Sequence, residues 1–398
     1  MKHVLSLSTL YPNGANPRFG TFVARSLEAL AKRGDWRVTC INPIGIPPIA
    51  LGRYRALSEL PATEEENGVV IHRPRFTLIP RIGARRNPSA IVKAALPLIE
   101  QIHANTPVDV VDAQFFYPDG PAAAAIAKAI GKPLSIKARG SDITYWGEQD
   151  FAREQMLDAA RHATGLLSVS GDLAKHMTAM GMPDSKITLH YTGLDRDRFR
   201  PLNHTQLRGQ LASELSFPLP DNAPLLVSVG ALIARKGQCF AIGALPSNPR
   251  ARLVLVGKGE DLEKLEAQTR ELKVADRVLF AGSLDHNLLP LILSAADAMV
   301  LPTENEGLAN SWVEALACGT PVVTCDVGGA RELITDDVAG RLLDQRSSEA
   351  VADAVNAVLN NPPRRQDVAA FANRFSWEQN AAELAAHFEK LSSGQNAS

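Results

Sequence analysis

Two carboxylates stand in the stretch TENEGLANSWVEALACGTPVV, residues 303–323, in different local settings. Glu306 lies in a polar segment that contains glycine, whereas Glu314 has Trp312, Val313 and Leu316 as close neighbours in the sequence. An ionised carboxylate in apolar surroundings needs hydrogen-bond donors or a cation, because an unpaired buried charge costs several kcal/mol. A bound sugar diol would supply two donors to Glu314. The alternatives are a core arginine that pairs with Glu314 and a solvated loop position for Glu306.

A helix is expected to begin near Asn310 or Ser311, because both are good N-cap residue types and both follow a strand-like run. The backbone N–H groups of Leu308, Ala309 and Asn310 would then lack helical acceptors. Together with the helix dipole they would favour a phosphate. Glu314 lies about one turn, roughly 6 Å, further along the helix axis. This spacing predicts a ribose at Glu314 and a distal phosphate at the helix start.

A sugar carried on that phosphate would lie beside Glu306, whose carboxylate can bind hydroxyls and stabilise positive charge as the anomeric bond breaks. A second loop, SVGALIARKGQ, ends another strand and carries Arg235 and Lys236, which could neutralise a departing diphosphate without a metal. A third loop, DVGGARELI, supplies Gly328 and Gly329 ahead of another helix. The alternatives are that Arg235 and Lys236 lie in a solvated basic loop and that Gly328 and Gly329 form a simple turn.

The composition narrows the class of protein. With 398 residues the chain suits two domains, and 45% apolar and 21% charged residues indicate a globular protein. The net charge of −1 provides no field for a polyanion, so no nucleic-acid partner is expected. Scattered cysteines indicate reduced core residues and no zinc site. No run approaches the roughly 18 apolar residues of a membrane span, so we expect a cytoplasmic protein that at most rests on a membrane surface. We also expect no cofactor and no bound metal.

Strand-length apolar runs alternate with amphipathic helical segments, which predicts an α/β fold with parallel sheets. The pattern restarts after a polar linker near 195–203. We expect two doubly wound, Rossmann-like domains, 1–195 and 203–376, that face each other across an active-site cleft, with a final helix at about 377–391 packing back onto the first domain. Strands are expected near residues 3–8, 36–41, 69–73, 108–113, 134–138, 165–169, 186–190, 224–230, 252–257, 277–282, 297–302 and 320–325.

A series of motifs runs almost continuously over residues 224–343: VGALIARKG, VLVGKGEDLEKLE, RVLFAG, ADAMVLPTENEGLANSWVEALACGTPVVTCDVGGARELI and GRLL. With their Glu, seven residues, Glu spacing they resemble the family 4 retaining glycosyltransferases, which have the GT-B fold. The first half resembles the family more loosely, through FGTFVARSLEALAKRG, FYPDG, RGSDI and GLDRDRF. The resemblance implies sugar transfer from a nucleotide sugar, retained anomeric configuration and no obligatory metal. It assigns the donor to the second half and the acceptor to the first.

The resemblance also implies roles for individual residues. Lys236 matches the family's diphosphate-binding lysine, Glu314 its ribose-binding glutamate and Glu306 its donor-sugar glutamate. Gly20 matches the glycine that lets backbone approach the donor phosphates. Gly230, the glycine at the end of a strand, completes the expected donor-binding set.

Two positions depart from the family pattern. Ala231 stands where an arginine is common, so either Arg235 compensates or the donor site is weaker. Arg139 stands where many members have a histidine, and an arginine cannot shuttle protons but can bind anionic oxygen. We expect Arg139 to take part in catalysis by contacting the donor sugar or an acceptor phosphate, with an ion pair to Asp142 as the alternative. Asp142 and Tyr117 are the candidates for acceptor binding.

The expected activity is transfer of a hexose from a UDP-sugar, or alternatively a GDP-sugar, to a glycan or a lipid-linked acceptor. A nucleotide-sugar epimerase or sugar phosphorylase of the same fold and a catalytically weak nucleotide-sugar-binding protein remain alternatives. A nicotinamide dehydrogenase is disfavoured, because no Gly-x-Gly-x-x-Gly follows the first strand. Segments 41–55 and 73–86 mix apolar residues with arginines. These segments could rest on an anionic membrane, where each basic residue near the surface contributes about 1 kcal/mol of binding free energy. The alternative is that they are ordinary loops with solvated arginines. These arginines are Arg53, Arg55, Arg73, Arg75, Arg81, Arg85 and Arg86.

Overall fold

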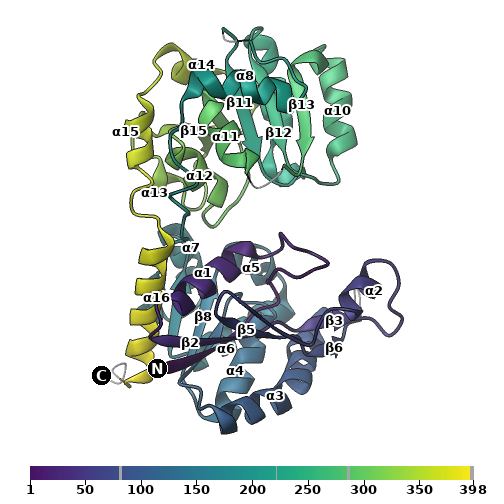
Figure 1. Cartoon of the computed structure of the whole chain (residues 1–398), viewed down its shortest axis with the longest axis vertical. Helices are drawn as coiled ribbons and strands as arrows, with labels where there is room; N and C mark the ends of the chain where they lie inside the picture. Colours follow the sequence, from purple (N-terminus) through teal and green to yellow (C-terminus); the bar gives the residue numbers. More distant parts are fainter. Residues whose placement is uncertain (80–82, 221, 285–286, 395–398) are drawn as a thin grey trace. The chain divides into compact units, whose positions relative to one another are not determined.

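The computed structural model describes residues 1–79, 83–220, 222–284 and 287–394. The chain divides into two units. The first comprises Met1–Gly193 together with the C-terminal segment that starts at Trp377, and the second comprises Leu194–Ser376. Figure 1 shows that each unit has its own sheet with helices packed on it.

The first unit is built on an eight-stranded sheet with the order β10-β9-β8-β7-β1-β2-β5-β4. All neighbouring strands are parallel except β4 and β5, which are antiparallel. The chain leaves the centre of the sheet in both directions from β1, which is the doubly wound arrangement. The strands are β1 (Lys2–Leu7), β2 (Trp36–Ile41), β4 (Thr63–Glu66), β5 (Val69–His72), β7 (Val110–Ala113), β8 (Leu134–Ala138), β9 (Gly165–Ser168) and β10 (Ile187–Leu189). A separate ribbon pairs β3 (Ile44–Ile46) with β6 (Arg75–Thr77).

Helices cover this first sheet. Helices α1 (Thr21–Lys32) and α16 (Trp377–Ser392) pack together on one face, where Leu27 and Phe388 meet Trp36 and Val38 in a common core. The C-terminal helix thus belongs to the first unit. The other helices are α2 (Arg53–Ser58), α3 (Asn87–Asn105), α4 (Asp119–Ile130), α5 (Ser141–Thr144), α6 (Asp150–His162) and α7 (Gly171–Met180).

The second unit has a six-stranded, all-parallel sheet with the order β13-β12-β11-β14-β15-β16. Its central strands are continuous apolar runs because helices cover both faces. The strands are β11 (Leu225–Val229), β12 (Arg252–Val256), β13 (Val278–Gly282), β14 (Ala298–Leu301), β15 (Val322–Cys325) and β16 (Gly340–Leu343). The helices are α8 (His204–Glu214), α9 (Gln238–Gly243), α10 (Leu262–Glu271), α11 (Leu288–Ala295), α12 (Asn310–Ala317), α13 (Ala330–Leu333), α14 (Ser348–Asn360) and α15 (Arg365–Ala370).

The predicted fold class, two doubly wound Rossmann-like units, is confirmed. Every strand predicted from the sequence is present, and the structure adds β3, β4, β6 and β16. All four cysteines are free, and only Cys239 is partly exposed. Among the described helices none is both long enough and apolar enough to cross a bilayer.

Candidate active site

Three loops of the second unit meet at one edge of its sheet. Because β11, β14 and β15 are adjacent and parallel, the loops that follow them leave from the same edge. Backbone hydrogen bonds tie these loops together. The Glu304 N–H donates to the Arg235 carbonyl at 2.7 Å, and the Gly329 N–H donates to the Gly307 carbonyl at 2.7 Å. The positions of the functional side chains are therefore set by backbone contacts between loops.

Two glycines allow this close approach. Gly237 and Gly328 both have positive φ angles, 73° and 54°. A Cβ atom on Gly237 would lie 2.2 Å from the Pro302 carbonyl oxygen, and one on Gly328 would lie 2.0 Å from the Glu306 carbonyl oxygen. Any larger residue would push the loops apart. Gly328 packs against the backbone of Glu306, and its predicted contact with the donor stays a prediction.

The predicted carboxylate and cations come together at this edge. The Lys236 ammonium donates to Oε1 of Glu306, and both side chains are largely buried. Arg235 lies 3.7 Å from the same oxygen and also donates to the Asn305 carbonyl at 3.2 Å. The Thr303 hydroxyl is 3.4 Å from Glu306 Oε1. The position of the Glu306 carboxylate is therefore fixed by contacts with two cations and a hydroxyl.

The start of α12 offers backbone donors. The helix begins at Asn310, and the cap position is Ala309, whose side chain cannot cap. The N–H groups of Leu308, Ala309 and Asn310 donate to no acceptor within the described part of the chain. Free N–H groups and the positive end of the helix dipole form an anion-binding arrangement. The predicted phosphate position is thus geometrically available.

Glu314 lies one turn further along α12. The residue is partly accessible to solvent, yet protein atoms crowd its carboxyl: burial raises its pKa to about 7, against the lowering effect of the Arg198 charge. No described residue forms a hydrogen bond with its carboxyl oxygens or an ion pair with them. The described residues therefore do not form the alternative arrangement, an ion pair between Glu314 and a core arginine. The carboxyl is left able to accept donors from a ligand.

The strand-end glycine and its neighbour complete this edge. Gly230 donates its N–H to the Val256 carbonyl at 2.9 Å, and a Cβ atom there would meet Lys236 side-chain carbons at an ordinary 3.8 Å. Ala231 is exposed, and its carbonyl accepts from the Gln238 amide. The position that departs from the family pattern thus carries no cation, and Arg235 is the nearby arginine that contacts Glu306.

Gly20 lies in the first unit, directly before α1, with φ of 72°. A Cβ atom there would lie 2.5 Å from the Leu10 carbonyl carbon and oxygen, so the position accepts only glycine without a shift of the backbone. The N–H groups of Thr21 and Phe22 have no acceptor among the described residues. This helix start is a second place where backbone donors face outward.

Arg139 is held by contacts within the first unit. Its guanidinium donates to the backbone carbonyl of Gln114 at 2.8 Å and also to the Gln114 side chain, and it stacks 4.7 Å from the centre of the Phe22 ring. Burial lowers its pKa to about 10. Asp142 bonds the backbone N–H of Arg139 and not its guanidinium. The predicted alternative, a side-chain ion pair, is therefore not formed.

The two candidates for acceptor binding already have partners inside the first unit. The fully buried Asp142 carboxylate accepts backbone N–H groups of Phe116, Arg139 and Gly140. The Tyr117 hydroxyl donates to the Ala84 carbonyl at 2.7 Å, and burial raises its pKa to about 12. Both side chains stabilise the loops that follow β7 and β8.

Sequence reasoning missed three side chains that shape these regions. Thr303 and Asn305 flank Glu306 in the same polar loop, and this proximity was the available signal. Gln114 directly follows β7 at the switch point of the first sheet, where polar residues commonly face ligands. Among the described residues there is no cluster of three or more His, Cys, Asp or Glu side chains arranged to hold a metal ion.

Both halves of the chain match glycosyltransferase family models. Residues 19–198 match the model described as Glycosyltransferase Family 4, and residues 213–375 match Glycosyl transferases group 1. The chain is similar to the Bacillus subtilis teichuronic acid biosynthesis glycosyltransferase TuaC, with 27% identity over 88% of each chain. A Mycobacterium tuberculosis GDP-mannose-dependent alpha-(1-6)-phosphatidylinositol monomannoside mannosyltransferase is 34% identical over 48% of this chain and 53% of its own.

Solved structures share the fold. Sucrose-phosphate synthase from Thermosynechococcus elongatus superposes with a TM-score of 0.79 at 19% identity, covering 99% of this chain and 100% of that one. Anabaena Alr3699/HepE in complex with UDP and glucose has a TM-score of 0.75 at 19% identity, covering 98% and 100%. The fold and the matched families define a glycosyltransferase of GT-B architecture. The chain belongs to the family 4 and group 1 type of these enzymes, so the resemblance to family 4 is confirmed.

Proposed function

We propose that the protein is a retaining, metal-independent hexosyltransferase. It moves a hexose from a nucleoside diphosphate sugar, with UDP favoured over GDP, to a hydroxyl of a glycan or lipid-linked acceptor in cell-surface polysaccharide or glycolipid synthesis. The observation that carries the proposal is the row formed by the Lys236–Glu306 pair, the amides at the start of α12 and the carboxyl of Glu314, the last two without partners among the described residues. The relatives and structural neighbours named above support a nucleotide-sugar donor.

The donor fits this row in one orientation. Ribose hydroxyls donate to Glu314, and the diphosphate accepts from the amides of Leu308, Ala309 and Asn310. Lys236 then lies between the diphosphate and Glu306, so it can stabilise charge on the leaving group while Glu306 binds the sugar. Stabilisation of charge that develops only in the transition state raises turnover more than substrate affinity.

Retention of configuration follows if attack and departure occur on the same face of the sugar. The leaving phosphate oxygen then takes the proton of the acceptor hydroxyl as the new glycosidic bond forms and the anomeric carbon–oxygen bond breaks. Glu306 stabilises the oxocarbenium-like sugar during this exchange. No separate protein base is needed in this scheme. The two cations beside Glu306 supply the neutralisation that a divalent metal supplies in other transferases.

In this proposal residues of the first unit bind the acceptor. Arg139 remains the proposed contact to the donor sugar or an acceptor phosphate, because its planar guanidinium lies beside Phe22 at the start of α1. Gly20 precedes the same helix and leaves its amides open. The Asp142 and Tyr117 side chains would then act on the acceptor through the loops that they hold in place.

Peripheral membrane attachment is part of the proposal. Ile49 and Leu51 are each 73% exposed, and Arg85 and Arg86 are exposed on the neighbouring segment. Arg73 is removed from the predicted basic set, because it is buried and paired with Glu64. Arg81 lies outside the described residues, as does the side chain of Arg53. Sedimentation with anionic liposomes at low and high salt tests the attachment, and absence of binding at low salt would contradict it.

The direct test of function is product analysis. The protein is incubated with UDP-glucose, UDP-galactose and GDP-mannose, with and without glycan and lipid-linked acceptors, in buffer with and without EDTA. A glycosylated product with the donor's anomeric configuration, formed equally with EDTA, is expected. An altered nucleotide sugar without acceptor would indicate the epimerase alternative. Binding without any product would indicate the nucleotide-sugar-binding protein.

A further inference from the structure

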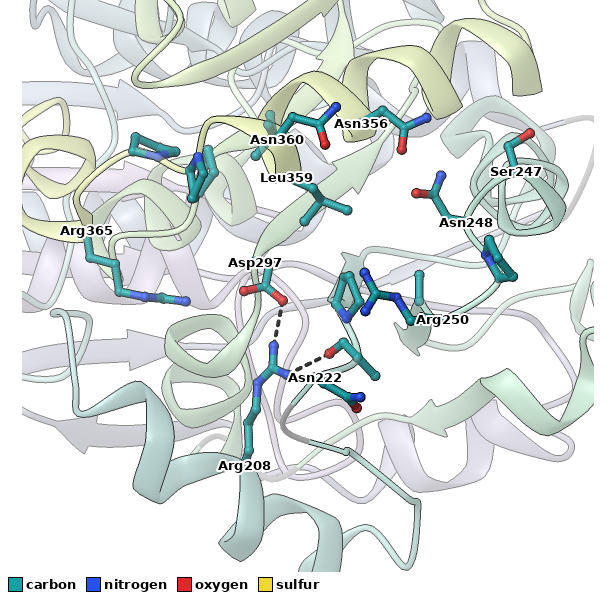
Figure 2. A pocket seen from close by; sticks show the side chains of 18 of the residues that line it. Arg208, Asn222, Ser247, Asn248, Arg250, Asp297, Asn356, Leu359, Asn360 and Arg365 are labelled. Carbon is teal, nitrogen blue, oxygen red and sulfur yellow. Dashed lines mark hydrogen bonds and ion pairs between the residues drawn. The ribbon is translucent and has the colours of Figure 1, made fainter.

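The second unit carries a cavity of about 480 Å³ at the edge of its sheet opposite to Lys236 and Glu306. Pro224, Asp297 and Pro321 line it, and each directly precedes a strand, β11, β14 or β15. Because these strands are parallel, their amino ends share this edge and their carboxyl ends share the other. The volume falls in the range of about 300 to 1,000 Å³ typical of small-molecule sites. Figure 2 shows its lining.

Part of the cavity wall is formed by Arg208 and Arg365, whose terminal guanidinium nitrogens are already hydrogen-bonded. Arg208 donates to Asp297 Oδ2 at 2.5 Å and to the Ala223 carbonyl at 2.6 Å. Arg365 donates to the Ser294 and Ala296 carbonyls at 2.6 Å each. These bonds anchor α8 and α15 to the strand edge. They fix the orientation of both arginine side chains.

Other donors in the cavity are left without partners. Asn248 is only 9% exposed, and its Nδ2 atom is buried without a hydrogen-bond partner. Leaving a buried donor unsatisfied is unfavourable, so its retention calls for an acceptor. Arg250 is exposed, and within the described part of the chain its guanidinium forms no hydrogen bond or ion pair. Figure 2 shows Asn248, Arg250 and Asn356 directed toward the same space.

The lining defines the chemistry of an occupant. Among the described residues that line the cavity, three are arginines and one is an aspartate, which Arg208 already neutralises, so this lining favours an anion. Its amide side chains can each donate to and accept from hydroxyl groups. Within the described lining no aromatic side chain is present to stack a nucleobase, and one paired carboxylate is a poor ligand set for a divalent cation. The amides are Asn222, Asn248, Asn356 and Asn360.

We propose that this cavity binds a hydroxylated anion of one or two sugar units, whose charge is a phosphate or a carboxylate. The anionic group pairs with Arg250, and the sugar hydroxyls meet the amides of Asn248, Asn356 and Asn360. The site is separate from the donor row and does not depend on the function proposed for it. The second unit would then hold two sugar-type ligands, one at each edge of a single sheet.

Isothermal titration calorimetry on the full-length protein tests the proposal. The probes are glucose 1-phosphate, glucuronate, glucose and inorganic phosphate. At least one of the two sugar acids should bind more tightly than glucose and inorganic phosphate. The acid that binds more tightly shows whether the site recognises a phosphate or a carboxylate group. Arg250→Gln and Asn248→Ala should each weaken this binding by about tenfold, the cost of one hydrogen bond to a charged or buried group.

Two further variants test whether the sugar acids bind in this cavity. Arg270→Gln, on α10, removes one positive charge from the same unit without touching the cavity and should leave the affinity unchanged. Lys236→Ala should also leave it unchanged, because that residue lies at the other edge. The proposal is overturned if neither acid binds saturably, if Arg250→Gln and Asn248→Ala leave the affinity intact, or if Lys236→Ala abolishes binding.

Discussion

Lys236 and Glu306 form an ion pair across two loops that follow adjacent parallel strands, β11 and β14. The pair joins a predicted leaving-group cation to a predicted sugar-binding carboxylate. In the absence of ligand each charge neutralises the other, which removes the cost of keeping either one largely buried and unpaired. A diphosphate that arrives beside Lys236 shares this cation with Glu306.

Substitution of either partner should lower turnover more than it weakens nucleotide binding. Glu306→Gln keeps the size of the side chain but removes the charge that stabilises the sugar cation. We expect kcat to fall by about 10²–10³-fold, with KM changed far less. Lys236→Ala should produce a similar loss through the leaving group. Lys264→Ala, an exposed lysine of the same unit, is the control. Wild-type kcat in Glu306→Gln would contradict the assigned role.

Nucleotide affinity should depend on the protonation state of Glu314. Its pKa is about 7 in the folded, ligand-free protein and 4.5 in a solvated reference, mainly because of burial. A ribose diol donates best to the ionised carboxylate, so UDP should bind more tightly as pH rises from about 6 to 8, with proton release. Glu314→Gln should flatten this dependence. Calorimetry in two buffers of different ionisation enthalpy measures the protons released.

The same shift has an opposite effect on stability. Between pH 4.5 and about 7 the folded protein keeps the Glu314 proton while the unfolded chain has lost it, so this group's contribution falls as pH rises through that window. The difference in unfolding free energy between wild type and Glu314→Gln should therefore decline with pH and level off above about 7. A difference that rises with pH would contradict the raised pKa.

Gly328→Ala should disrupt the site through backbone contact. The new Cβ would lie 2.0 Å from the Glu306 carbonyl oxygen, at a φ of 54° that alanine avoids. We expect about 1–3 kcal/mol of destabilisation and a matching loss of turnover as the Glu306 loop shifts. Gly282→Ala, with φ of 60° and only an ordinary contact at 3.9 Å, carries the backbone cost alone. Equal turnover in the two variants would exclude the contact as the cause.

Asn380→Ala should loosen the C-terminal helix from the first unit. The buried Asn380 side chain accepts from the Ser26 hydroxyl at 2.7 Å and donates to the Tyr191 carbonyl at 2.7 Å. Loss of both bonds should cost about 2–4 kcal/mol. Lys390→Ala, exposed on the same helix, should cost far less. Urea unfolding of the two variants measures the difference, and similar midpoints would show that α16 is held by apolar packing alone.

The sheets of both units were predictable because their strands are runs of apolar residues with regular spacing. β4 was not, because its sequence TEEE is polar and it pairs at the sheet edge. The missed strands β3 and β6 are three residues each, too short for a periodic signal. β16 was quoted as a motif without being recognised as a strand. Short edge elements depend on their neighbours for stability, and their own sequences reveal little.

The candidate site likewise has features that the sequence predicts and features that it does not. Convergence of the loops around Lys236 and Glu306 follows from parallel strand order, which the sequence indicates. The partners of Asp142 could not be predicted, because they are backbone N–H groups and every residue type except proline carries one. The supporting role of Gly328 was equally hidden, since its contact is with a backbone carbonyl in a different loop.

The central claim is that the Glu314 carboxyl accepts hydrogen bonds from the ribose hydroxyls of a bound nucleotide. A double comparison by calorimetry tests it, with UDP and 2′,3′-dideoxy-UDP titrated into wild type and Glu314→Ala. Loss of the hydroxyls should weaken binding to wild type by about tenfold or more and should have little further effect on the variant. If loss of the hydroxyls weakens binding to both proteins equally, Glu314 does not hold the ribose and the donor orientation proposed here is wrong.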